Sequence, residues 1–114
     1  MRLNIKATNL ELSANLKAYV QKKMDMLDKY LGKFKILKAK FEVDKTTNHH
    51  KKGEIYCAEA NLVVNGDLLR VQKTEKDMFK AVDKVKDHLE IMIKKYRDKK
   101  IERKKKKVKL GAME

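Results

Sequence analysis

The sequence contains no proline and only one cysteine, Cys57. The lack of proline excludes a proline-rich linker, and a single cysteine excludes both an internal disulfide and a metal site built from several cysteines. A lone thiol suits a reducing compartment. No run of about 18 apolar residues is present, and residues 1–12 lack the apolar stretch of a signal peptide. We therefore expect a cytoplasmic protein with no membrane association.

Motifs for catalysis and metal binding are also missing. The chain has no glycine-rich phosphate loop, no nucleophile signature and no carboxylate pair whose spacing predicts a shared cleft. His49 and His50 are adjacent in a polar stretch, but no Cys, Asp or Glu stands at zinc-site spacing around them. We expect neither an enzyme nor a metal or cofactor site.

Positive charge is what the chain has in excess. Its 114 residues include 30 Lys and Arg against 16 Asp and Glu, a net charge of +14. Residues 99–114 hold eight basic and two acidic residues, a net +6, which leaves +8 for residues 1–98. We predict one folded domain over residues 1–98 and a flexible basic tail over 99–114. Such a charge attracts nucleic acid or an anionic membrane surface.

Apolar spacing in the first third predicts a strand and then a helix. Residues 2–7 alternate between apolar and polar, which is typical of a strand with one wet face. From Ser13 the apolar residues recur every three or four positions, so we predict a helix capped by Ser13 and ended near Gly32. The apolar face of this helix would consist of Leu16, Tyr19, Val20, Met24, Leu27 and Leu31.

Three further strands are predicted in the middle of the chain. Residues 36–44 alternate, and a polar loop of about ten residues follows them. Asn65-Gly66 then separates two alternating runs, which predicts a tight hairpin because both turn positions need a positive φ. The side chains predicted to face inward are Leu37, Ala39, Phe41, Val43, Tyr56, Ala58, Ala60, Leu62, Val64, Leu69 and Val71.

Residues 73–97 are the most regular stretch and predict a second helix. Thr74 followed by Asp77 resembles a capping box with Asp in place of Glu. A coiled-coil seam is one interpretation of the apolar stripe, but it lasts only about three heptads, so packing against the sheet is favoured. The order of elements predicts an α+β domain with a four-stranded sheet and both helices on one face. The stripe comprises Met78, Val82, Val85, Leu89, Met92 and Tyr96.

Basic residues lie off the apolar faces of both predicted helices. A charged face is usually only solvated, but a net +8 on residues 1–98 exceeds what solubility requires. The outward strand positions carry no aromatic platform for stacked bases, which favours folded RNA bound through its shape and phosphates. His88 is either a surface residue or a switchable cation near phosphates. The candidate RNA-contacting residues are Lys22, Lys23, Lys29, Lys80, Lys84, His88, Lys94, Lys95 and Arg97.

The helical segments resemble a known family. LKAYVQKKMDMLDKYL and, more sharply, DMFKAVDKVKDHL…KKYRDK are similar to the ribosome hibernation-promoting factor and protein Y family of bacteria, also described as ribosome-associated inhibitors or sigma-54 modulators. Lys80 stands in one small-residue place of the family signature, and the residues that match it are Asp77, Met78, Phe79, Ala81, Val82 and Asp83. The resemblance covers residues 1 to 100, with the elements in the same order.

The resemblance implies a β-α-β-β-β-α domain similar to double-stranded RNA-binding folds. It also implies a protein that binds the small ribosomal subunit and its rRNA, where mRNA and tRNA would lie, and so blocks translation during stress or stationary phase. Lys23, Lys95 and Arg97 fall on basic places of the family. Where relatives carry Lys and an Arg-Gln pair, this chain has His88 and then Ile91-Met92, and Lys80, Lys84, Lys86 and Lys94 are candidates to compensate.

The length predicts a short form without the additional domain that pairs ribosomes in long members. We expect a monomer, and a second factor for ribosome pairing is a possible further partner. Two other interpretations stay open from the sequence. One is a general RNA- or DNA-binding protein driven by its tail, and the other is an interaction module that dimerises through the second helix.

Overall fold

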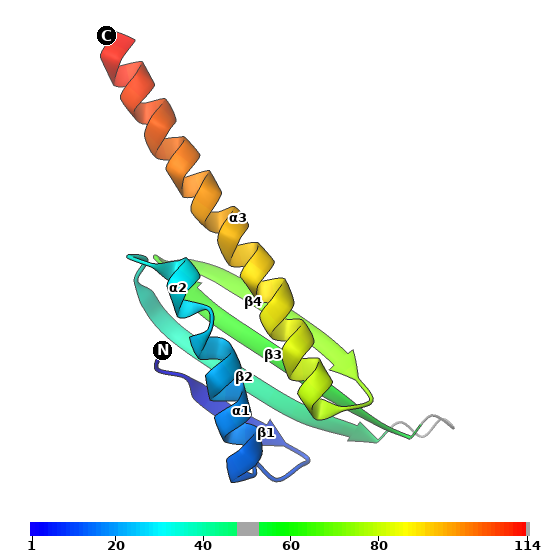
Figure 1. Cartoon of the computed structure of the whole chain (residues 1–114). Helices are drawn as coiled ribbons and strands as arrows, with labels where there is room; N and C mark the ends of the chain where they lie inside the picture. The colour runs from blue at the N-terminus through cyan, green and yellow to red at the C-terminus, as the bar shows by residue number, and fades with distance from the viewer. Residues whose placement is uncertain (48–52, 114) are drawn as a thin grey trace.

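The computed structural model describes residues 1–47 and 53–113, with side chains described for residues 1–46 and 53–100. His49 and His50 lie outside the described residues. Two helices and a short helical turn accompany four strands (Figure 1). In chain order the elements are β1 (Asn4–Thr8), α1 (Ala14–Asp25), α2 (Asp28–Leu31), β2 (Ile36–Thr47), β3 (Glu54–Val64), β4 (Asp67–Glu75) and α3 (Met78–Met113).

The four strands form one mixed sheet in the order β1-β2-β3-β4. β1 runs parallel to β2, and the other neighbours are antiparallel. Because parallel neighbours need a crossover, α1 and α2 connect β1 to β2 across one face of the sheet. α3 lies on that same face beside α1, and no helix of the described residues covers the opposite face (Figure 1). The predicted β-α-β-β-β-α order and α+β class are confirmed.

The predicted hairpin between β3 and β4 is confirmed. Asn65 and Gly66 have φ angles of 52° and 89°, and a tight two-residue β-hairpin turn requires such positive φ angles at both positions. The Asn65 side-chain carbonyl also accepts a hydrogen bond of 2.9 Å from the Lys35 backbone N–H. This bond ties the turn to the chain entering β2.

The first helix begins as predicted but is divided in two. Ser13 caps it, because the Ser13 Oγ accepts a 3.1 Å hydrogen bond from the Leu16 N–H. The Leu27 N–H bonds to the Met24 carbonyl at 3.0 Å, three residues back, so the chain tightens between α1 and α2. Gly32 ends α2 with a φ of 52°.

The prediction that Leu37 faces the core is wrong. Its side chain is 63% exposed. Ile36 pairs with Val64 and Lys38 with Val63, so β2 has one residue more than β3 at this place. This β-bulge turns Leu37 outward, after which Ala39 resumes the inward alternation.

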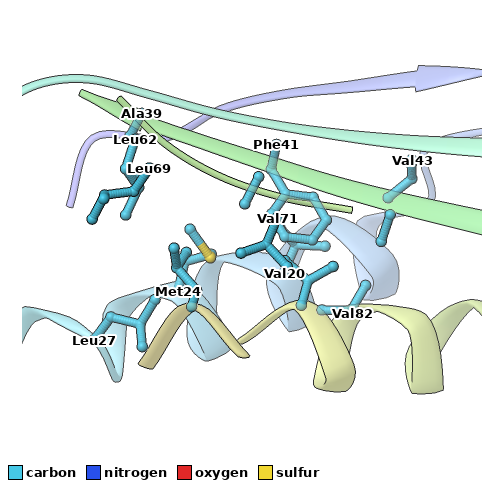
Figure 2. Packing of buried hydrophobic residues seen from close by; sticks show 14 of the residues in the cluster. Val20, Met24, Leu27, Ala39, Phe41, Val43, Leu62, Leu69, Val71 and Val82 are labelled. Atoms are coloured by element: carbon cyan, nitrogen blue, oxygen red, sulfur yellow. The ribbon is translucent and has the colours of Figure 1, made fainter. Parts of the chain in front are cut away.

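One hydrophobic core lies between the sheet and the helices. Phe41 is fully buried at its centre, with Val20 and Met24 of α1 on one side and Val82 of α3 nearby (Figure 2). The interpretation of the second helix as core packing is confirmed, because its stripe is buried in this chain. Sequence spacing missed two members of that stripe, Ala81 and Ile93. Buried α3 residues are Met78, Ala81, Val82, Val85, Leu89 and Ile93, with Met92 and Tyr96 packed against them.

The start of α3 also differs from the prediction. Thr74 does not cap this helix, because it lies in β4 opposite Cys57. Asp77 is the cap: its Oδ1 accepts a 2.8 Å hydrogen bond from the Phe79 N–H, and its backbone carbonyl accepts from Ala81. α3 then continues past residue 99, so the boundary between domain and flexible tail stays a prediction. None of the helices in the described part of the chain is long and apolar enough to span a membrane.

Candidate nucleic-acid interface

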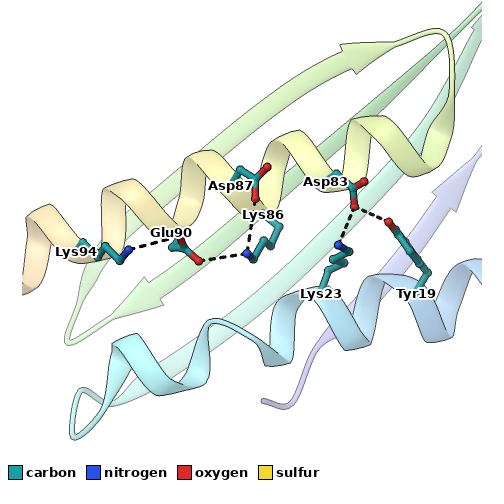
Figure 3. A network of polar contacts seen from close by, with 7 residues as sticks. All are labelled: Tyr19, Lys23, Asp83, Lys86, Asp87, Glu90 and Lys94. Atoms are coloured by element: carbon teal, nitrogen blue, oxygen red, sulfur yellow. Dashed lines mark hydrogen bonds and ion pairs between the residues drawn. The ribbon is translucent and has the colours of Figure 1, made fainter.

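A polar network joins α1 to α3 on the side away from the sheet (Figure 3). The Tyr19 hydroxyl donates a hydrogen bond of 2.5 Å to Asp83, and the Lys23 ammonium lies 3.3 Å from the same carboxylate oxygen. These contacts with Asp83 raise the pKa of both Tyr19 and Lys23. The Tyr19 ring also meets Phe79 edge to face, with 4.9 Å between centroids. Lys23 is thus fixed in place, but its charge is partly neutralised.

A second network runs along α3. The Lys86 ammonium lies 3.1 Å from Glu90 and 3.6 Å from Asp87 (Figure 3). Burial lowers the pKa of Lys86, yet hydrogen bonding to Glu90 and the nearby Asp87 charge leave that pKa raised overall. Only 9% of Lys86 is exposed, so this residue is closed off from an RNA ligand. Among the lysines proposed to compensate for Ile91 and Met92, Lys86 is therefore the poorest candidate.

Lys29 of α2 and Lys94 of α3 converge on the ring of Tyr30. Their ammonium groups lie 4.9 Å and 4.7 Å from the ring centroid. The attraction of each cation to the ring holds the two side chains beside each other despite their like charge. Lys94 also lies 3.5 Å from Glu90. Two predicted RNA-contacting residues from different helices are thus brought together at one point.

Of the remaining predicted residues, Lys22 lies on α1 and the others lie on two sides of α3. Arg97 follows Lys94 by three residues, so it lies on the same side of α3, towards α1 and α2. Lys80, Lys84, His88 and Lys95 share the other side, which faces β4. Lys84 pairs with Glu75 of β4. Exposed candidates with no ion pair to another described residue are Lys22, Lys29, Lys80, His88, Lys95 and Arg97.

One basic residue on this second side was absent from the predicted set. Lys73 of β4 lines a surface hollow together with Lys84 and His88 of α3. Its position could be deduced from alternation, because Leu69 and Val71 face inward and Lys73 continues the same face. The prediction placed all RNA-contacting residues on the helices, and it therefore missed Lys73 on β4.

Comparison with known proteins decides which family this chain represents. Residues 3–101 match the family described as sigma 54 modulation protein / S30EA ribosomal protein. The chain belongs to this family. The match spans every strand, both shorter helices and the part of α3 that packs on the sheet. The family resemblance expected from the helical motifs is confirmed.

Relatives in the S30EA family differ in length. A ribosome hibernation promotion factor from Lactococcus lactis is 30% identical over 97 residues, which cover 85% of this chain but 50% of the relative. The Deinococcus radiodurans factor is 27% identical, and the match covers 45% of it. The chain therefore spans about half the length of these two relatives. The Escherichia coli factor is 28% identical over 99 residues and is covered to 96%.

Solved structures agree with the fold of the S30EA family. The N-terminal domain of Thermus thermophilus protein Y superimposes with a TM-score of 0.68 at 28% identity. The match covers 82% of this chain and 94% of that domain. A ribosomal subunit interface protein from Coxiella burnetii, at 20% identity and a TM-score of 0.65, shares the fold.

Proposed function

We propose that this protein binds the small ribosomal subunit and silences it as a ribosome hibernation factor. The observation that carries the proposal is the family match over residues 3–101, together with relatives named ribosome hibernation promotion factors. The protein acts by occupying the region that mRNA and tRNA would enter. Inhibition is then steric and requires no catalysis.

Binding depends on phosphate contacts from the exposed side chains of α1, α2 and α3. Lys22, Lys80 and Lys95 support this role, because each is exposed and forms no ion pair with another described residue. Lys29 and Arg97 meet the same description, and the cluster around Tyr30 adds Lys94. Recognition through several phosphates suits folded RNA, whose grooves offer shape more than base edges.

Salt dependence of binding tests the mechanism. Each phosphate neutralised by a lysine or arginine releases counterions, so about five contacts predict a log–log slope near −4. Affinity for purified small subunits should then fall on the order of a hundredfold between about 50 and 200 mM salt. Co-sedimentation over this range measures it. Binding that is insensitive to salt would contradict phosphate contact, and absence of binding would contradict the proposed function.

A footprint on the ribosomal RNA tests the location. Protection of nucleotides between the head and body of the small subunit is expected if the protein occupies the mRNA and tRNA path. Protection confined to the outer surface of the subunit would contradict steric exclusion. The same preparation should inhibit initiation in a cell-free translation assay at stoichiometric concentration.

A further inference from the structure

A hollow lies between the edge of the sheet and α3. Its lining comprises Gln72, Lys73, Thr74, Lys84, Asp87, His88 and Ile91. β4 is an edge strand, and no other strand in the described part of the chain pairs with its outer side. The backbone groups on that side therefore point into the region beside the hollow. The hollow is therefore bordered by the edge of β4 and one side of α3, and several cationic side chains line it.

Cations from two elements converge here. Lys73 lies on the inward face of β4, but only where the strand leaves the core, so its side chain is half-buried and reaches the hollow. Lys84 and His88 come from α3 and stand one helical turn apart. The long aliphatic stem of a lysine can cover apolar surface while its ammonium stays accessible, which explains a lysine at an inward position.

The acidic residues of this region are already partnered. Glu75 pairs with Lys84, and the Asp87 carboxylate lies 3.6 Å from the Lys86 ammonium. Lys73, by contrast, forms no ion pair with any described residue. The charge of Lys73 is thus available for an external anion.

We propose that this hollow binds a backbone phosphate of ribosomal RNA through Lys73, with Lys84 and His88 beside it. The inference rests on the proposed function and extends the interface from the helices to the edge of the sheet. No Phe, Tyr or Trp lines the hollow, so it offers no platform for a stacked base. Phosphate is the RNA group that such a set of donors fits.

A single charge removal tests the proposal. Lys73→Gln should weaken binding to salt-washed small subunits about eightfold at about 0.1 M salt and make the log–log salt slope shallower by about 0.9. Lys73→Arg keeps the positive charge, so it should retain the wild-type affinity and the wild-type salt slope. The matched control is Lys38→Gln, which removes the same charge from an exposed position on the helix-free face of the sheet. It should leave affinity within about twofold of wild type, because that face lies away from the interface.

His88→Lys provides an independent measurement. It adds a permanent charge beside Lys73 and should raise affinity at neutral pH by several-fold, about the factor expected for one phosphate contact. Circular dichroism establishes that each variant is folded, and if Lys73→Gln does not fold, His88→Lys decides. If wild-type protein binds but Lys73→Gln behaves as Lys38→Gln, or His88→Lys gives no gain, the inference is wrong while the proposed function stands. If wild-type protein does not bind, both are wrong.

Discussion

The hydroxyl of Tyr19 lies 2.5 Å from the Asp83 carboxylate, and this contact joins α1 to α3. The same carboxylate lies 3.3 Å from the Lys23 ammonium. Asp83 therefore holds the two helices together while it masks a cation predicted to contact RNA. Helix docking and the proposed RNA binding make opposite demands on this one side chain.

Asp83→Asn should separate these two demands. The free energy of unfolding should fall by about 1 kcal/mol, because a charge-assisted hydrogen bond is weakened at a partly exposed site. Affinity for the small subunit should rise several-fold, because no neighbouring carboxylate then offsets the charge of Lys23. Urea denaturation and co-sedimentation measure the two effects. Asp98→Asn makes the same charge change on α3 away from any described ion pair, and an equal gain in affinity there would contradict a specific role of Asp83.

The β-bulge in β2 predicts unequal effects for two apolar residues of that strand, Leu37 and Phe41. Leu37→Ser should change the free energy of unfolding by no more than about 0.5 kcal/mol, because the side chain is already in solvent. Phe41→Ala should cost about 3–5 kcal/mol, because it empties a fully buried site. Denaturant titration of both variants measures this. A large loss for Leu37→Ser would show that the side chain is buried in solution.

Charge reversal on the α3 side that faces β4 should impair ribosome binding in a folded protein. Lys84→Glu with Lys95→Glu replaces two cations by two acids, so affinity should fall by at least about a hundredfold at low salt. The control Lys6→Glu with Lys38→Glu makes the same net change on the helix-free face of the sheet. Co-sedimentation and circular dichroism measure binding and folding. Equal losses in the two double variants would mean that only the net charge matters.

Acid should weaken the network along α3. Hydrogen bonding to Lys86 lowers the pKa of Glu90 in the folded protein below its usual value near 4.5. The resulting stabilisation is complete above the unfolded pKa and is lost as pH falls through the lower folded pKa. Wild type should therefore exceed Glu90→Gln in stability at pH 7, and the difference should shrink by pH 3. Thermal unfolding across this range measures it, and a constant difference would contradict the ionic contribution.

Removing residues 99–114 should leave a folded protein that still binds ribosomes. Among the residues of α3 whose side chains are described, Ile93 is the last fully buried one, and Tyr96 packs against the same core. The truncation spares these residues and, among the described side chains, removes only the surface contacts of Lys100 with Asp67 and the Tyr96 ring. Affinity should fall because a net +6 is lost, but a specific footprint should remain. Complete loss of binding would favour the general nucleic-acid binder driven by its tail.

The order of elements and most of the core could be predicted from hydrophobic spacing, because strand and helix periods are properties of the chain itself. Leu37 could not be placed, because a bulge depends on register with β3, which lies about 25 residues away. Thr74 and Asp77 are both good helix caps, and only strand pairing with Cys57 shows that Thr74 belongs to β4. Pairing between strands that are distant in the sequence determines whether Leu37 faces solvent and whether Thr74 belongs to β4 or caps α3.

The sequence predicted which residues are on the polar faces of the helices, but it did not predict their contacts with other elements. Side chains on the polar faces of α1 and α3 follow from helical spacing, and all nine predicted residues are in the described part of the chain. Spacing gives no information about partners across elements, so the neutralisation of Lys23 by Asp83 could not be deduced. The position of Lys73 beside α3 required the tertiary packing of β4.

The strand order in the sheet is the same as the strand order in the sequence. β2, β3 and β4 therefore each pair with the strand made just before or just after them, whereas β1 pairs with β2 only after the α1 and α2 crossover has been made. Sheet formation can advance from the N-terminus while the rest of the chain is still being synthesised. Local pairing of this kind favours rapid folding. We therefore expect the pairing of β2, β3 and β4 to be complete soon after β4 has been synthesised.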